Sequence, residues 1–249
     1  MTWLSPAFFA TALLYASVGF GGGSTYNALL SLAGFDFRLL PIVSLCCNVV
    51  VVTGGTIRFA RAGVTPWKQA LLLSLIAAPL AYLGGRTPIR EETFLVLLGL
   101  SLVAAGLALL LPRPAEQAAE PARAARFMPL VAVPLGYLAG LVGIGGGIFL
   151  APLLHFTRWA NGKAIAATTS LFILINSLAG LYGQAAKNGA GAFGEALSGA
   201  LPLLIAVVIG GQIGSAMALR ILSERTLRWL TAALTIWAGS KLLWDQLAG

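Results

Sequence analysis

The chain has 249 residues, of which 58% are hydrophobic and 10% charged, and its mean hydropathy is +0.89. A soluble domain carries about 25% charged residues, so a soluble globular fold is excluded. Segments of about ten residues with strict apolar and polar alternation are missing, which excludes a transmembrane β-barrel. The composition therefore predicts an all-α polytopic membrane protein.

The chain begins with two short apolar segments separated by Gly21, Gly22, Gly23 and Ser24. At 1.5 Å per residue, neither segment alone can cross a hydrocarbon core of about 30 Å as a helix. They are expected to form a re-entrant hairpin or two half-helices that meet near mid-membrane. The sequence leaves both arrangements open.

Seven further apolar stretches follow, and most approach the roughly 20 residues that span hydrocarbon as a helix. They are Leu39–Phe59, Trp67–Gly85, Phe94–Leu111, Phe127–Val142, Ala164–Ala186, Ala196–Leu219 and Leu227–Leu243. The fourth is short and leads into a second triple glycine, Gly145–Gly147. Each half of the chain is therefore expected to hold a glycine-broken short helix pair and three long transmembrane helices.

The landmarks of the first half recur in the same order in the second half. Residues 18–23 read VGFGGG and residues 142–147 read VGIGGG, and Gly84-Gly85 corresponds to Gly210-Gly211. The charged, proline-containing stretch between the halves is typical of a solvated linker. We predict a first repeat at residues 1–111, a linker at 112–126 and a second repeat at 127–249.

An odd number of crossings per half would place the second repeat upside down relative to the first. Under that topology the sixteen Lys and Arg residues divide into eleven on the linker face and five on the other. An even number divides them eight and eight. The positive-inside rule favours the inverted arrangement. We expect a bacterial inner-membrane protein with a cytoplasmic linker and both termini outside.

Glycines at lipid depth expose backbone groups that hydrocarbon cannot satisfy. Half-helix N-termini at mid-membrane offer N–H groups and a positive dipole end to an anion. The candidate substrate-binding residues are these glycines and the polar residues that follow them: Gly21, Gly22, Gly23, Ser24, Asn27, Ser44, Asn48, Gly145, Gly146, Gly147, Thr169, Ser170 and Asn176. Simple helix packing and interhelical hydrogen bonding are the alternative roles of the same residues.

Other functions find little support in the sequence. The basic residues cluster at segment ends, as topology signals do, so no nucleic-acid partner is expected. The acidic residues also lie near segment ends, so a buried carboxylate relay is not expected. No catalytic set or metal-ligand spacing is evident, so we expect no enzyme, cofactor or metal. The expected partners are the lipid bilayer and a small anion, and the sequence also allows a homo-oligomer.

The chain resembles the sulfite exporter TauE/SafE permeases over nearly its full length. The resemblance rests on Gly19–Ser24, on Gly143–Gly147 followed by Pro152, and on Ala167–Leu171 with Asn176 and Gly180. It implies an inner-membrane permease for sulfite, sulfonates, thiosulfate or a related sulfur anion. The inverted halves separately favour a carrier that works by alternating access around a central site. The first half departs from the pattern, with Ala28 in place of the proline. An anion channel and a non-transporting scaffold or sensor are the alternatives.

Overall fold

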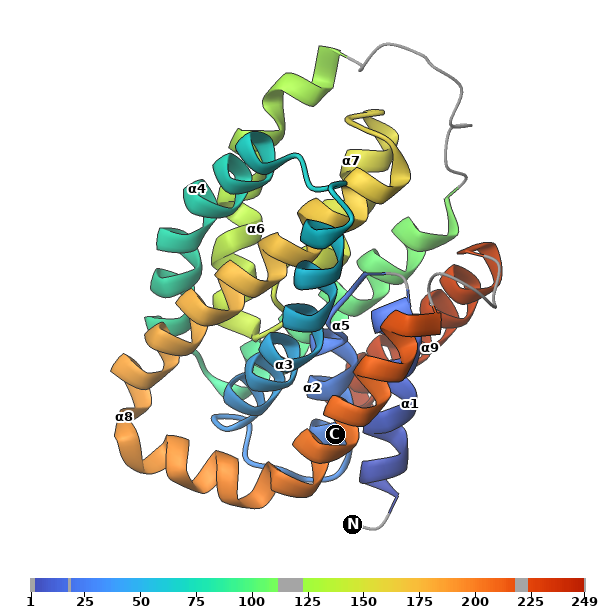
Figure 1. Cartoon of the computed structure of the whole chain (residues 1–249). Coiled ribbons are helices and arrows are strands. Elements are labelled where there is room, and N and C mark those ends of the chain that lie inside the picture. Colours follow the sequence, from blue (N-terminus) through green and yellow to red (C-terminus); the bar gives the residue numbers. More distant parts are fainter. Residues whose placement is uncertain (1–2, 18, 112–122, 218–223, 249) are drawn as a thin grey trace.

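The computed structural model describes residues 3–17, 19–111, 123–217 and 224–248, and these residues form helices joined by short turns (Figure 1). The first half contains α1 (Leu4–Ser17), α2 (Gly23–Leu32), α3 (Leu40–Arg61), α4 (Trp67–Arg86) and α5 (Glu91–Leu110). The second contains the 3-10 helix η1 (Arg123–Phe127), α6 (Met128–Val142), α7 (Gly147–Phe156), α8 (Gly162–Met217) and α9 (Glu224–Ala248). The predicted all-helical class is confirmed for the described residues.

Six stretches of the described chain are long and apolar enough to cross a membrane. They are Leu40–Arg61, Trp67–Arg86, Glu91–Leu110, Arg123–Val142, Gly162–Gly189 and Gly191–Ala216. The fourth is longer than the sequence predicted, because η1 extends α6 backwards over residues assigned to the linker; residues 112–122 of that linker lie outside the described chain. The predicted span Leu227–Leu243 lies within α9, which is not among the six because Thr, Trp and charged residues lower its hydropathy.

The two apolar stretches after α7 were predicted as separate helices, and the structure has two helices there that meet at a kink. One helical ribbon runs from Gly162 to Met217, and within it Gly189 departs from helical geometry with φ 76° and ψ 171°. The turn between the two spans is thus one glycine, with helix on both sides.

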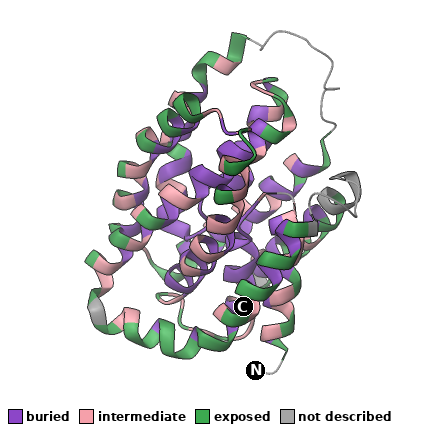
Figure 2. Ribbon diagram, in the orientation of Figure 1, coloured by how far each residue is buried: buried purple, intermediate pink, exposed green. Residues whose placement is uncertain are grey.

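Glycines set the closest helix contacts of the bundle. A Cβ on Gly140 of α6 would lie 2.7 Å from the carbonyl carbon of Ala81 in α4, and one on Gly214 of α8 would lie 2.8 Å from that of Leu13 in α1. The Gly210 and Gly214 pair therefore packs helices, as a GxxxG motif predicts. Buried residues line the middle of the bundle, and exposed residues cover its outside (Figure 2).

Candidate functional site

Two breaks in the helical backbone lie in the buried core. One separates α1 from α2, and the other separates α6 from α7. Gly22 caps α2 with φ 85° and Gly146 caps α7 with φ 75°, a left-handed conformation that an L side chain adopts only at a cost of about 1–2 kcal/mol. The first N–H groups of each helix have no intrahelical acceptor. Both breaks therefore offer backbone donors at the positive end of a helix dipole.

The side chain of Asn48 lies between the two breaks. It projects from α3, is fully buried, and touches three of the candidate glycines. A Cβ on Gly145 would lie 2.8 Å from Asn48 Nδ2, and Cβ atoms on Gly21 and Gly23 would lie 2.9 and 3.0 Å from its Cγ. A side chain at any of these three positions would collide with the Asn48 amide, and this reason for glycine is separate from the backbone conformation.

Among the described residues, the Asn48 amide has no hydrogen-bond partner at either Oδ1 or Nδ2. A buried polar atom left unpaired costs about 1–3 kcal/mol, and such atoms in a folded protein require an explanation, such as water or a ligand. Asn27 Oδ1, Thr169 Oγ1 and Asn176 Oδ1 are also buried without a partner. The predicted site residues thus supply a set of unused polar atoms.

Two first-half side chains bind the second break directly. Asn27 in α2 donates from Nδ2 to the carbonyl of Val142 at 2.6 Å. Ser44 Oγ lies 2.6 Å from the carbonyl oxygen of Gly23 and 2.9 Å from that of Gly143, within donating distance of both. The two breaks, more than a hundred residues apart in sequence, are therefore held together by α2 and α3.

One face of α8 closes the cluster from the other side. Ile173 would touch Cβ atoms on Gly21, Gly145 and Gly147, at 3.3 Å from the first and 2.9 Å from the second. Ser177 Oγ lies 3.0 Å from the Cβ position of Gly145 and has no partner. Steps of three, four and seven along a helix share a face, so Thr169, Ile173 and Asn176 are neighbours on this side.

Some predicted residues have structural partners instead. Ser170 is 3.0 Å from Thr56 Oγ1 and donates to the Val52 carbonyl at 3.2 Å, which ties α8 to α3. Asn176 Nδ2 donates to the carbonyl of Phe172 in its own helix. Ser24 is buried in the first turn of α2. All buried polar residues in the described chain are Ser, Thr, Asn or Gln, so no formal charge lies in this core.

The candidate set leaves out several residues that touch the glycines, among them Ile173 and Ser177. Ile173 could not be recognised from sequence, because an apolar residue in an apolar helix carries no signal. Ser177 stands next to Asn176 among the polar residues of the same helix, and that position alone is the signal that identifies it.

Comparison with known proteins agrees with this architecture. The family model described as sulfite exporter TauE/SafE matches residues 4–242. A probable membrane transporter protein of Sinorhizobium fredii is 35% identical over 252 residues, covering 97% of both chains. Another, of Methanocaldococcus jannaschii, is 24% identical over 193 residues, covering 74% of this chain and 72% of its own. No solved structure matches significantly. The chain therefore belongs to the sulfite exporter TauE/SafE family of membrane transporters.

Proposed function

We propose that the protein transports small sulfur-containing anions, such as sulfite, sulfonates or thiosulfate, and binds them between the two helix breaks. The observation that carries this proposal is the unpaired amide of Asn48, which touches glycines of both breaks. An amide offers two N–H donors to an oxyanion, and the helix N-termini beside it favour negative charge. The description of the family supports sulfur as the element carried.

The proposed mechanism is alternating access by two inverted repeats, residues 1–111 and 127–249, with residues 112–126 as a cytoplasmic linker and both termini outside. Contacts between the halves support it, because a helix of one half packs on a helix of the other half in two equivalent ways. Helix α4 packs on α6, while the second part of α8, which corresponds to α4, packs on α1, which corresponds to α6. Helices α5 and α9 also pack on each other. Rocking of such repeats would expose a central site to each side in turn.

Ligand-induced stabilisation tests the proposal. Purified protein is melted with sulfite, thiosulfate, sulfoacetate, taurine, sulfate and chloride, each well above the expected dissociation constant. A ligand at 100 times its dissociation constant stabilises the native state by about 2.7 kcal/mol, or about 5–10 °C for a chain of this size. We expect this shift with one sulfur anion and not with chloride.

Asn48→Leu and Thr53→Val form a matched pair of variants on α3. Leucine keeps the branched shape of asparagine without its polar atoms, whereas the Thr53 hydroxyl only bonds the carbonyl of Val49 in its own helix. We expect the shift, and transport into proteoliposomes, to disappear in Asn48→Leu and persist in Thr53→Val. Equal shifts in both variants would place the anion elsewhere. A scaffold or sensor without this site would show no shift with any of these anions.

A further inference from the structure

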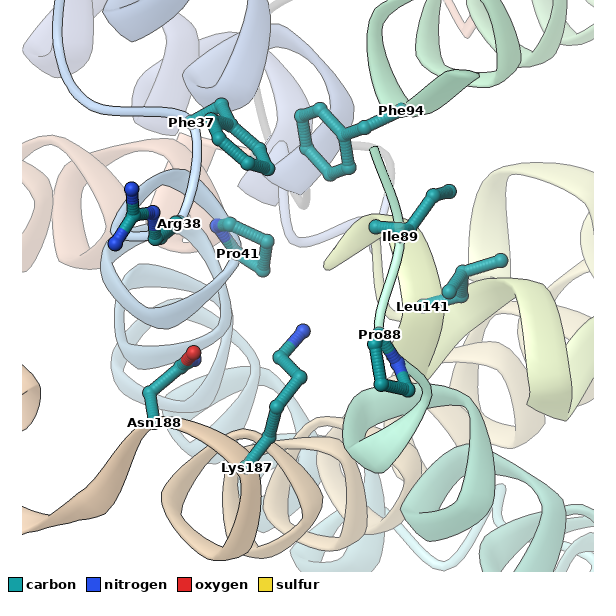
Figure 3. A pocket seen from close by; sticks show the side chains of 9 residues that line it. All are labelled: Phe37, Arg38, Pro41, Pro88, Ile89, Phe94, Leu141, Lys187 and Asn188. Atoms are coloured by element: carbon teal, nitrogen blue, oxygen red, sulfur yellow. The ribbon is translucent and has the colours of Figure 1, made fainter. Parts of the chain in front are cut away.

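A cavity of about 220 Å³ lies near the helix breaks but is not part of them. Its walls come from the segment before α3, the α4–α5 connection, the first turn of α5, the end of α6 and the end of the first part of α8 (Figure 3). These segments are far apart in sequence. The fold therefore assembles one cavity from both halves of the chain.

The cavity contains an unpaired cation. Lys187 lines it, and Figure 3 shows the amine of Lys187 directed into the space between the lining residues. Among the described residues, the Lys187 ammonium has no hydrogen-bond or ion-pair partner. A lysine that served only as a topology signal would extend its amine into water. The ammonium of Lys187 is therefore available to a negatively charged group from outside the chain.

The other charged lining residue among those described is Arg38, which is ion-paired with Asp36, so the unpaired charge at the cavity is that of Lys187. Arg38 lines the cavity with a side chain that is 68% exposed, and its nearest carboxylate is Asp36 at 3.8 Å. None of the described lining residues carries a carboxylate. The charge balance therefore favours an anion over a cation or a neutral molecule.

The opposite wall is apolar. It is formed by Phe37, Ile89 and Phe94, and the two aromatic rings lie 6.2 Å apart between centroids. A cavity of about 220 Å³ is several times the roughly 30 Å³ that one water molecule occupies in the liquid. It has room for an anion that carries carbon, and the apolar wall offers that carbon a dry surface.

The cavity is adjacent to the candidate transport site. Pro41 and Leu141 line it, and a Cβ on Gly143 of the second break would lie 2.5 Å from the Cα of Pro41. Ser44, which bonds both breaks, is three residues after Pro41 in α3, and one helical turn rises about 5.4 Å. An anion in this cavity would therefore lie about one turn from the breaks.

We propose that this cavity binds a small organic anion before it reaches the helix breaks, with the oxyanion group against Lys187 and a short apolar tail against Phe37, Ile89 and Phe94. That the cavity binds the anion on its way to the transport site rests on the proposed function. The affinity for a charged head with an apolar tail does not, since it follows from the cavity alone.

Titration calorimetry at low salt with methanesulfonate, propanesulfonate and uncharged 1-propanol tests the proposal. Each buried methylene strengthens binding about fourfold. Propanesulfonate has two more methylenes than methanesulfonate and should therefore bind about fifteenfold more tightly, and 1-propanol should not bind measurably. Lys187→Met should weaken propanesulfonate binding at least tenfold, because a hydrogen bond to a charged group is lost. Lys187→Arg keeps the charge and should retain most of the affinity, which shows that the loss is not due to misfolding.

Arg90→Gln is the matched control. Arg90 follows Ile89 in the same connection, is highly exposed, and does not line the cavity. It should bind like the wild type. Wild-type affinity in Lys187→Met, or equal affinity for the two sulfonates, would overturn the proposal.

Asn48→Leu separates this proposal from the previous one. The cavity should still bind propanesulfonate in Asn48→Leu, even where transport is lost. Normal transport in Asn48→Leu would refute the proposed transport site, and the binding of propanesulfonate to the Lys187 variants would still decide whether the cavity binds anions. Normal binding in Lys187→Met, with transport lost in Asn48→Leu, would remove the cavity proposal alone.

Discussion

Replacing Asn48 by leucine tests whether the buried amide is kept at a cost to the ligand-free fold. Each unpaired polar atom of Asn48 destabilises the ligand-free protein by about 1–3 kcal/mol, and leucine removes both. The methyl groups of leucine are slightly larger, and their crowding against the glycines destabilises the variant by about 1–3 kcal/mol. The expected net gain is about 2 kcal/mol, which raises the melting temperature by about 4–8 °C for a chain of this size. Asn48→Leu should therefore be more stable than the wild type although it does not transport.

Ser44→Ala, one turn away on the same helix, should do the opposite. Its hydroxyl has two carbonyl acceptors in the structure, so the variant should lose about 1 kcal/mol and melt at a lower temperature. Both variants can be melted without ligand in detergent, followed by the fluorescence of the six tryptophans. If Asn48→Leu loses as much stability as Ser44→Ala, the amide is satisfied in the ligand-free protein and the reasoning fails.

The following predictions use the same melting assay. Gly145→Ala should lose about 1–3 kcal/mol, because φ is 75° and the new Cβ would lie 2.8 Å from Asn48 Nδ2. In an Asn48→Ala background this loss should be smaller, although the contacts with Ile173 and Ser177 remain, and an unchanged loss would contradict the contact with Asn48. Gly140→Val should lose 2 kcal/mol or more, because its Cβ would meet the backbone of Ala81 and push α4 away from α6. Ser74→Ala should change stability by less than about 1 kcal/mol, because its hydroxyl only bonds the Ala70 carbonyl within α4; a larger effect would reveal an interhelical role.

The long helices could be predicted because their signal is local. Helices α3, α4 and α5 coincide with apolar stretches to within a few residues, since a membrane span needs a continuous run of apolar residues. The start of the second half was less predictable. Residues Arg123–Phe127 are charged and look like linker, yet they form η1 and extend α6. The sequence placed residues 187–195 outside the apolar stretches, whereas the structure breaks the helix there at Gly189.

The candidate site was predictable only in part. Glycine runs and asparagines at lipid depth are costly, so the sequence proposed both breaks and Asn48 as candidate site residues. It did not predict that Asn48 touches glycines of both halves, because that contact depends on how α3 packs in the bundle. Lys187 was counted among topology signals, since sequence says nothing of where a lysine points.

The hydrogen bonds of Ser44 have a consequence for motion. A hydroxyl has one proton, so at any instant Ser44 can donate to Gly23 in one half of the chain or to Gly143 in the other, at 2.6 and 2.9 Å. Exchanging acceptors requires only a rotation about the Cβ–Oγ bond, on the picosecond to nanosecond timescale of side-chain rotations. The Ser44 hydroxyl can therefore move its hydrogen bond from one break to the other. The hydroxyl keeps an acceptor if either break shifts away from α3.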